Sequence, residues 1–351
     1  MIMLKALLFF LFSFLFSVQA LFPAKWIVCN QRSEGSHYWS IQTAIEHAAP
    51  YDTIFVKGSP VNYGNVLLEK PLVLIAEGSI YGDLPDNSAK LTRVLLTSNP
   101  FRRTISSGSS IIGFEFPYFA GNRPNIVTVS DEKTKIHDIT IERNWIWFIQ
   151  VAGKAHNWLF RNNVIRGWVN GGSAGDQKNA VSRDFFFHNN IINSIRGFED
   201  GNIQVHNNII TGRLKDISGA EIYNNIFTRE TLVLENVYGC NFRGNIAVSD
   251  QLGSADCYQY PGRFESMNTC KGISNSGSGN RAGTDPGFLS WPSSDIMGGS
   301  VFKLSGGSVA IRAGVNGQQA GIFGGRYPFP EYTFRNQEID DPFPSFVTSI
   351  Y

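Results

Sequence analysis

The sequence carries almost no net charge and few charged residues. Lys and Arg together number 30, Asp and Glu number 29, and charged residues make up 17% of the 351. Lys5 lies in an N-terminal segment that we expect to be removed, which leaves 29 residues of each sign. A chain without an excess of basic residues has no general electrostatic reason to bind nucleic acid. We therefore expect no nucleic-acid partner.

Common catalytic and metal-binding motifs are also missing. The sequence has no P-loop, no dinucleotide-binding glycine motif, no GxSxG elbow and no HExxH helix. None of the four cysteines (Cys29, Cys240, Cys257 and Cys270) belongs to a CxxC pair, so we expect no metal site. Three of them lie in one region, and we expect a disulfide that joins Cys257 to either Cys240 or Cys270.

Long apolar runs are absent except at the N-terminus. Residues 1–20 have a lysine, an apolar stretch over 6–16 and the small-x-small sequence Val18-Gln19-Ala20, which is the pattern of a signal peptide. The stretch is too short for a membrane span, and no later segment is long enough for one. We expect cleavage near Ala20 and a secreted protein, extracellular or periplasmic, with no membrane span. An oxidising compartment would permit the disulfide.

What the sequence does contain is an internal repeat. Six segments (141–146, 160–165, 187–192, 205–210, 222–227 and 242–247) share apolar pairs on either side of a polar turn. Their aligned asparagines follow at intervals of 19, 27, 18, 17 and 20 residues: Asn144, Asn163, Asn190, Asn208, Asn225 and Asn245. A period of this length indicates a solenoid, and the absence of a helical apolar pattern makes its unit a β-unit.

Stacking of parallel β-coils explains the asparagines. Equivalent side chains of successive coils lie about 4.8 Å apart, so the apolar residues form continuous columns inside. Asn tolerates the left-handed backbone angles of a sharp turn, and stacked amides can hydrogen-bond along the column. We therefore expect a structural ladder rather than catalytic asparagines.

At this point the chain resembles the right-handed parallel β-helix proteins of the pectin-lyase-like superfamily. The resemblance is carried by the residues 40–45 and 52–56 at the start and by 284–288 and 304–311 at the end. It implies an all-β solenoid over residues 21–326, with a short capping helix at 40–49 and coils from 53 to 250. Two turn positions depart from the family: Tyr51 replaces a usual Gly, and Gln319-Ala320 replaces an Asp-aliphatic pair.

The end of the chain divides further. Residues 251–282 are predicted to form an irregular excursion that carries the disulfide, and residues 283–325 to close the solenoid. The Pro-rich tail at 327–351 is predicted to pack along the outside as extended chain.

Binding residues are expected beside the long interval between Asn163 and Asn190. The extra residues fall in a Gly-rich loop at 168–178, and projecting loops often carry function. Coil stacking would gather basic residues near this loop into a stripe suited to sugar carboxylates or sulfates, with indoles as platforms for sugar rings. The predicted substrate-binding residues are Arg166, Trp168, Asp176, Arg196, Arg213 and Arg229. The alternative is a solvated ion-pair ladder with Glu199, Asp216 and Glu230.

The sequence offers no complete set of catalytic residues. β-Elimination from a uronate needs a base and a group that neutralises the carboxylate, and the candidates for these roles are Lys178, Arg183, Arg213 and Lys215. Ca²⁺ would be the cofactor of a lyase, but no acidic cluster suggests a site for it, and otherwise we expect no cofactor. Glu199 and Asp216 are a weak pair for hydrolysis. His188 and His206 share a repeat position, and we expect them to stack.

The leading hypothesis is therefore an exported, monomeric β-helix protein that binds a polysaccharide along one face. An acidic polysaccharide would suit the basic stripe. A polysaccharide lyase or another carbohydrate-active enzyme acting on a uronate-containing glycan is the alternative. A surface adhesin or protein-interaction module is the third hypothesis.

Overall fold

The computed structural model describes residues 23–31, 33–77, 88–118, 123–128, 135–151, 155–172, 183–199, 201–291 and 302–330. The predicted signal peptide, residues 173–182 with Asp176 and Lys178, and residues 331–351 of the predicted tail lie outside these ranges.

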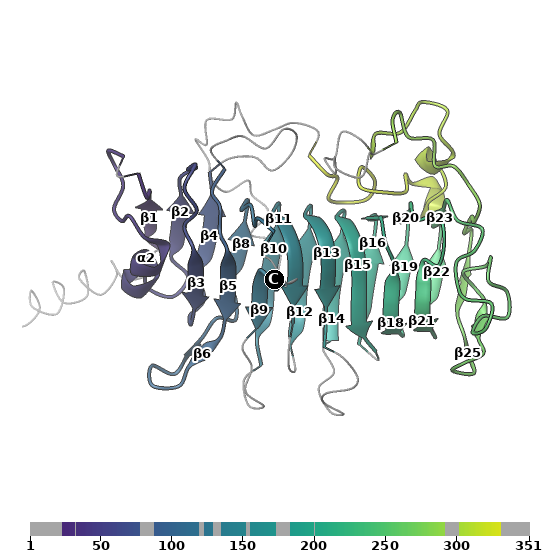
Figure 1. The fold of residues 1–351 in the computed structure, drawn as a ribbon, viewed down its shortest axis with the longest axis horizontal. Coiled ribbons are helices and arrows are strands. Elements are labelled where there is room, and N and C mark those ends of the chain that lie inside the picture. Colours follow the sequence, from purple (N-terminus) through teal and green to yellow (C-terminus); the bar gives the residue numbers. More distant parts are fainter. Residues whose placement is uncertain are drawn as a thin grey trace, which may run out of the picture.

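Two long parallel sheets make up most of the described chain (Figure 1). Sheet A consists, in spatial order, of β1 (Lys25–Val28), β2 (Thr53–Val56), β4 (Val73–Ala76), β8 (Ser110–Ile112), β10 (His137–Glu142), β12 (His156–Arg161), β14 (Arg183–His188), β16 (Ile203–His206), β19 (Glu221–Tyr223), β22 (Asn241–Arg243) and β26 (Ser276–Ser278). Sheet B consists of β3 (Asn65–Leu68), β5 (Arg93–Leu96), β9 (Ile126–Thr128), β11 (Trp145–Gln150), β13 (Val164–Asn170), β15 (Ile191–Phe198), β17 (Ile209–Ile210), β20 (Ile226–Phe227) and β23 (Ile246–Ala247), with β18 (Leu214–Ser218) and β21 (Leu234–Tyr238) extending it beside β15.

The chain alternates between the two sheets. From β2 to β23, each strand of sheet A is followed by one or two strands of sheet B, and the next strand of sheet A pairs in parallel with the previous one. We call one such A–B passage a rung. The register between rungs is regular: Phe160 of β12 lies beside Phe187 of β14, which lies beside Val205 of β16. The prediction of a mostly β chain built from stacked parallel strands is confirmed.

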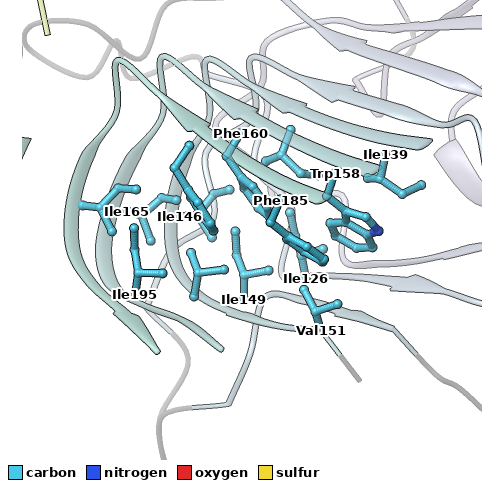
Figure 2. Close-up of a cluster of buried hydrophobic side chains, with 14 of the residues drawn as sticks. Ile126, Ile139, Ile146, Ile149, Val151, Trp158, Phe160, Ile165, Phe185 and Ile195 are labelled. Carbon is cyan, nitrogen blue, oxygen red and sulfur yellow. The ribbon is translucent and has the colours of Figure 1, made fainter. Parts of the chain in front are cut away.

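The core lies between the sheets and consists of apolar columns (Figure 2). Sheet A contributes aromatic rings, of which Phe160 and Phe187 stack at 4.8 Å with an 8° interplanar angle. Sheet B contributes β-branched residues such as Ile146, Ile165 and Ile195, all fully buried. Because side chains repeat at every rung, burying one column buries apolar surface along the whole length of the sheets.

The two ends of the sheets are covered. At the first end, α2 (Ile41–His47) begins at Ser40, whose Oγ accepts a hydrogen bond from the Thr43 amide, and it buries Ile41, Ala44 and Ile45. This matches the helix predicted at 40–49. Strand β1, which precedes the helix and pairs with β2, was not expected from the sequence. It places one more strand at the edge of sheet A.

The region predicted as an irregular excursion, 251–282, is more ordered than expected. It holds the hairpin of β24 (Met267–Asn268) and β25 (Ile273–Ser274), and Cys257 is bonded to Cys270, one of the two pairings left open. Tyr258 and Phe264 enter the core and cover the second end. Strand β26 then continues sheet A by pairing with β22, so the last rung lies inside this region.

Residues 302–330, which we call the C-terminal strap, contribute no strand to either sheet. The strap contains two short 3₁₀ turns, Val309–Ile311 and Val315–Gly317, and runs back along the outside of the rungs, seen in yellow at the top of Figure 1. The predicted closing segment thus packs on the flank of the sheets instead of extending them. Among the elements outside the sheets, β6 (Ser98–Asn99) and β7 (Thr104–Ile105) form a projecting hairpin.

Candidate functional site

An asparagine ladder holds the rungs in register at the turns from sheet A to sheet B. The backbone amide of each ladder residue donates to the Oδ1 of the next at 2.9–3.0 Å, and its Nδ2 donates to the same oxygen, from Asn144 to Asn245. Each Nδ2 also donates to a strand carbonyl of the preceding rung; that of Asn208, for example, bonds Phe187 O at 2.8 Å. Asn280 continues the ladder beyond Asn245 and was missed, because its segment does not resemble the repeat.

The left-handed backbone angles fall on the residue before each ladder asparagine. Arg143, Asn162, Asn189, Asn207 and Asn224 have φ between 53° and 58°, and Gly244 has φ of 61°. We expected the ladder residues themselves to adopt this conformation, and that expectation was wrong. The two asparagines of each Asn-Asn pair divide the work: the first makes the turn and the second makes the ladder.

The first asparagines also hold the strap. Asn189 Nδ2 donates to the carbonyl oxygens of Ile322 and Gly324 at 2.8 and 2.7 Å. Asn207 Nδ2 donates to Gln319 O at 3.1 Å, and Asn224 Oδ1 accepts from the Val315 amide at 2.7 Å. The strap therefore crosses the rungs one after another, each time on a turn residue whose side chain the ladder does not use.

Beneath the strap lies an apolar column that points away from the core. It is formed by the residues directly after each ladder asparagine: Trp145, Val164, Ile191, Ile209, Ile226 and Ile246. Strap residues such as Ala320, Ile322 and Phe329 pack against this column, and each is at most 1% exposed. The strap thus supplies the cover that a row of exposed β-branched side chains requires.

Next to the strap, the outer face of sheet A carries a polar row in register. Its members are Glu142, Arg161, His188, His206, Tyr223 and Arg243. The cations at its two ends have carboxylate partners: Arg161 bonds Glu142 at 2.7 Å and Arg243 bonds Glu221 at 2.8 Å. The two imidazoles stack, as expected, at 4.9 Å with a 10° interplanar angle.

The outer face of sheet B carries a different set, which we call the arginine–tryptophan row: Trp147, Arg166, Trp168 and Arg196. The Arg166 guanidinium lies 4.5 Å from the Trp147 ring centre, and that of Arg196 lies 4.1 Å from the Trp168 ring centre. In both pairs the arginine reaches back over the indole of the preceding rung, which is a cation–π arrangement.

Local packing fixes the positions of these side chains. Phe148 fills the space between the two indoles, and its ring centre lies 5.1 Å from that of Trp168. A Cβ at Gly167 would come within 2.2 Å of the Phe148 ring, so a glycine is required between Arg166 and Trp168. Burial lowers the pKa of Arg196, and the nearby Asp216 partly offsets this effect. Its guanidinium nevertheless stays charged.

The row continues into an ion-pair cluster. Register places Gln150, Asn170, Arg196, Lys215 and Glu235 side by side. Glu235 accepts from Lys215 and also from Arg213. Burial alone would raise the pKa of Glu235, but these two hydrogen bonds and charges hold it below its ordinary value.

The predicted binding stripe is therefore brought together in part. Arg166, Trp168 and Arg196 lie together, whereas Arg213 is held by Glu235 and the Arg229 side chain turns back to the Thr231 carbonyl at 2.7 Å. Asp176 lies outside the described residues. The partner of Arg213 is thus Glu235, which was not among the three carboxylates named from the sequence and which lies in register beside Lys215.

The catalytic candidates do not meet. Lys215 and Arg213 share Glu235 on sheet B, Arg183 begins β14 in sheet A beside His156, and Lys178 is outside the described residues. The remaining carboxylates, Glu199 and Asp216, are near neighbours, since both accept from Asn236 Nδ2, at 3.5 and 2.8 Å.

The tryptophans of this region lie in three settings. Trp147 and Trp168 stand on the outer face of sheet B, and Trp145 lies under the strap. Trp158 is fully buried in the core, with its indole N–H bonded to the Ile136 carbonyl. Only two of the four can therefore meet a ligand on the sheet B face.

No family model, curated protein or solved structure matches this chain. Within the described ranges, no group of three or more His, Cys, Asp or Glu side chains is placed to hold a metal ion. In the same part of the chain, no helix has the length and apolar character needed to cross a membrane.

Proposed function

We propose that this chain is a right-handed parallel β-helix of the pectin-lyase-like kind, exported by its N-terminal segment. The strict alternation of strands between two parallel sheets, the asparagine ladder and the covered ends support this assignment. Parallel crossover connections are right-handed in nearly all known sheets, which supports the hand. The apolar run of residues 6–16 after Lys5, and Ala20 at the cleavage pattern, support export.

The function that we propose is binding of an acidic polysaccharide along the arginine–tryptophan row. The observation that carries the proposal is that neither Arg166 nor Arg196 forms a direct ion pair among the described residues, although each is fixed over an indole and Asp216 acts on Arg196 from nearby. A positioned guanidinium that is not in an ion pair suits a carboxylate or sulfate, because its fork donates two parallel hydrogen bonds.

The neighbouring side chains suit the uncharged part of a sugar. Asn170 Nδ2 donates to Gln150 Oε1 at 3.1 Å, and Gln150 Nε2 donates to the Val151 carbonyl at 3.2 Å. Each of these NH₂ groups has a second N–H that can donate to a sugar hydroxyl. Tyr118 is 51% exposed and stands edge-on to Trp147 at 4.9 Å, extending the aromatic surface. Because these features repeat from rung to rung, a polymer with repeated anionic groups fits the row better than a small solute.

Catalysis by a lyase has less support, since Lys215 and Arg213 are both engaged by Glu235. A lysine can act as a base only after its ammonium has lost a proton. An ion pair with a carboxylate stabilises the charged ammonium and so opposes this loss. Binding without chemical change is therefore the function that the described residues favour.

The test is affinity electrophoresis and calorimetry with pectate, alginate and a sulfated glycosaminoglycan, each at two salt concentrations. We expect one of these to bind, and Arg196→Ala and Trp168→Ala each to weaken binding about tenfold or more. Arg243→Ala is the matched control, because Arg243 lies over Tyr223 on sheet A with Glu221 as its partner. Absence of binding to all three polymers, or an equal loss in Arg243→Ala, would overturn the proposal.

The same samples separate the alternatives. A rise in absorbance from unsaturated uronate products, lost in Lys215→Ala, would replace the binding assignment by a lyase. Capture of no polymer in any condition would instead favour the protein-interaction hypothesis.

A further inference from the structure

The polar row next to the strap holds two imidazoles in an unusual electrostatic setting. His188 and His206 stack face to face, and the Tyr327 ring of the strap lies over His188 at 6.0 Å with a 17° interplanar angle. His206 is 8% exposed. The Nε2 atoms of both histidines are buried and have no hydrogen-bond partner in the described part of the chain.

The charged groups around this pair favour its neutral form. Arg161 of β12 lies over Tyr327 at 5.2 Å, Arg326 of the strap lies 5.3 Å from the same ring, and Arg243 of β22 faces His206 beyond Tyr223. The nearby carboxylates are engaged elsewhere, Glu142 with Arg161 and Glu221 with Arg243. A proton added to either imidazole would thus enter a region of positive charge, with no free acceptor of that charge.

We propose that the C-terminal strap is an acid-sensitive cover: protonation of the His188–His206 pair releases residues 302–330 from the turns between sheets A and B. The strap is suited to release because it adds no strand to either sheet and is held by separate turn contacts. Its release uncovers the apolar column that begins at Trp145 and ends at Ile246.

The direction of the pH effect follows from burial. Burial, with a further contribution from Arg161, lowers the pKa of His188 to about 4. Burial also lowers the pKa of His206, and the charges of His188 and Arg243 add to this. Once the strap detaches, water reaches the rings and their pKa values return toward the ordinary value of about 6.5. The open state then binds protons more readily than the closed state.

Strap docking is accordingly at full strength above pH 6.5 and weakens as the pH falls from 6.5 toward 4. Each histidine shifts the equilibrium between docked and released strap by at most about tenfold per pH unit in this window. Two coupled histidines make the response steeper than one.

A second histidine pair on the same sheet provides an internal reference. His137 and His156 stack at 4.9 Å, but they are more exposed, and His137 Nδ1 lies 2.6 Å from Asp138 Oδ2. A proton on this pair has a carboxylate beside it and no strap above it. We expect no effect of this pair on the strap.

The experiment is hydrogen exchange followed by mass spectrometry on the full chain at pH 7.5 and pH 5.0, corrected for the intrinsic exchange rate. We expect strap amides such as that of Phe329, which bonds the Ile322 carbonyl, to lose protection at least tenfold at pH 5.0, while ladder amides keep theirs. Fluorescence of Trp145, which the strap buries, should change over the same pH range.

Variants isolate the two imidazoles. His188→Phe/His206→Phe keeps stacked rings in a row that already contains Tyr223, and it should retain strap protection at pH 5.0. His156→Phe is the matched control and should respond to acid as the unmodified chain does. If the double variant is poorly folded, His206→Tyr alone should reduce the steepness of the response. Two results would contradict the proposal. One is strap protection in the unmodified chain that is the same at pH 5.0 as at pH 7.5. The other is an acid response in His188→Phe/His206→Phe and His206→Tyr that equals the response of the unmodified chain.

Discussion

Arginines lie over aromatic rings on both sheets, but in two different electrostatic settings. On sheet A, Arg161 lies over Tyr327 and Arg243 lies over Tyr223, and each has a carboxylate partner within 3 Å. On sheet B, Arg166 and Arg196 lie closer to their indoles, at 4.5 and 4.1 Å against 5.2 and 5.5 Å on sheet A, and neither forms a direct ion pair in the described chain. The arrangement of cation over ring is shared, and the difference is the direct carboxylate partner.

This difference separates structural cations from available ones. The sheet A arginines complete an internal network beside the strap, and the charge of each is already balanced. The sheet B arginines are also held over aromatic rings, but neither is in a direct ion pair among the described residues, so an anionic ligand can bind them without breaking one. The comparison predicts opposite outcomes for the two faces: substitutions on sheet A change stability, and substitutions on sheet B change binding.

The largest effect is expected at the ladder, because it supports both faces. In Asn208→Ala, the amide that donates to Asn225 Oδ1 and Phe187 O is lost, and the Asn190 amide loses its acceptor. With several buried groups left unpaired, we expect a loss of about 3–5 kcal/mol in the free energy of unfolding by urea denaturation. Asn202→Ala, at an exposed Asn bonded to Asp184, is the control and should cost under about 1 kcal/mol.

The next prediction tests sheet A, where the arginines have carboxylate partners. Glu142 is 6% exposed and binds both Arg161 and Arg143, so Glu142→Gln removes the carboxylate charge from both of these ion pairs. We expect a loss of about 2–3 kcal/mol in the free energy of unfolding, since removing one member of a largely buried ion pair is costly. A loss below about 1 kcal/mol in the same denaturation experiment would mean that sheet A and sheet B arginines do not differ.

On sheet B, substitution of an arginine should change the free energy of unfolding less than on sheet A. Arg166→Ala removes a half-exposed cation–π contact with Trp147, which contributes about 0.5–1 kcal/mol. We therefore expect a small loss of unfolding free energy together with weaker polysaccharide binding. A loss as large as that of Glu142→Gln, with unchanged binding, would reverse the assignment of roles to the two sheets.

The repeat made the rungs predictable, because one-dimensional stacking converts a sequence interval into a spatial neighbour. The alignment of Asn144 through Asn245 therefore predicted both the ladder and the pairing of His188 with His206. The strap was not predictable in this way. It joins segments more than 100 residues apart, as in the bond from Asn189 to Ile322, and no periodicity marks such a contact.

The ion-pair partners of the arginines could not be predicted from the sequence either. Offsets from the turn asparagines suggested Glu199, Asp216 and Glu230 as partners for the arginines as a group. Arg213 instead pairs with Glu235, which lies in β21 from Leu234 onward. The binding stripe could be placed on a flank because Arg166 and Arg196 follow consecutive ladder turns. Their indole partners could not be assigned, because the register shifts within β11 and β13 beside Phe148 and decides which ring each guanidinium covers.

The smallest effect on the free energy of unfolding is expected at a turn that belongs to neither sheet face. Tyr51 has φ of 71° and is 61% exposed, in the position where the resemblance led us to expect glycine. Left-handed angles cost a non-glycine residue about 1–2 kcal/mol, and the greater freedom of glycine in the unfolded chain offsets about half of the gain. Tyr51→Gly should therefore raise the free energy of unfolding by about 0.5 kcal/mol and leave polysaccharide binding and the acid response of the strap unchanged. Tyr51→Ala is the matched control: it removes the same ring but keeps a Cβ at positive φ, so a gain in Tyr51→Ala as large as that in Tyr51→Gly would show that the ring, and not the backbone angle, is the source of the strain.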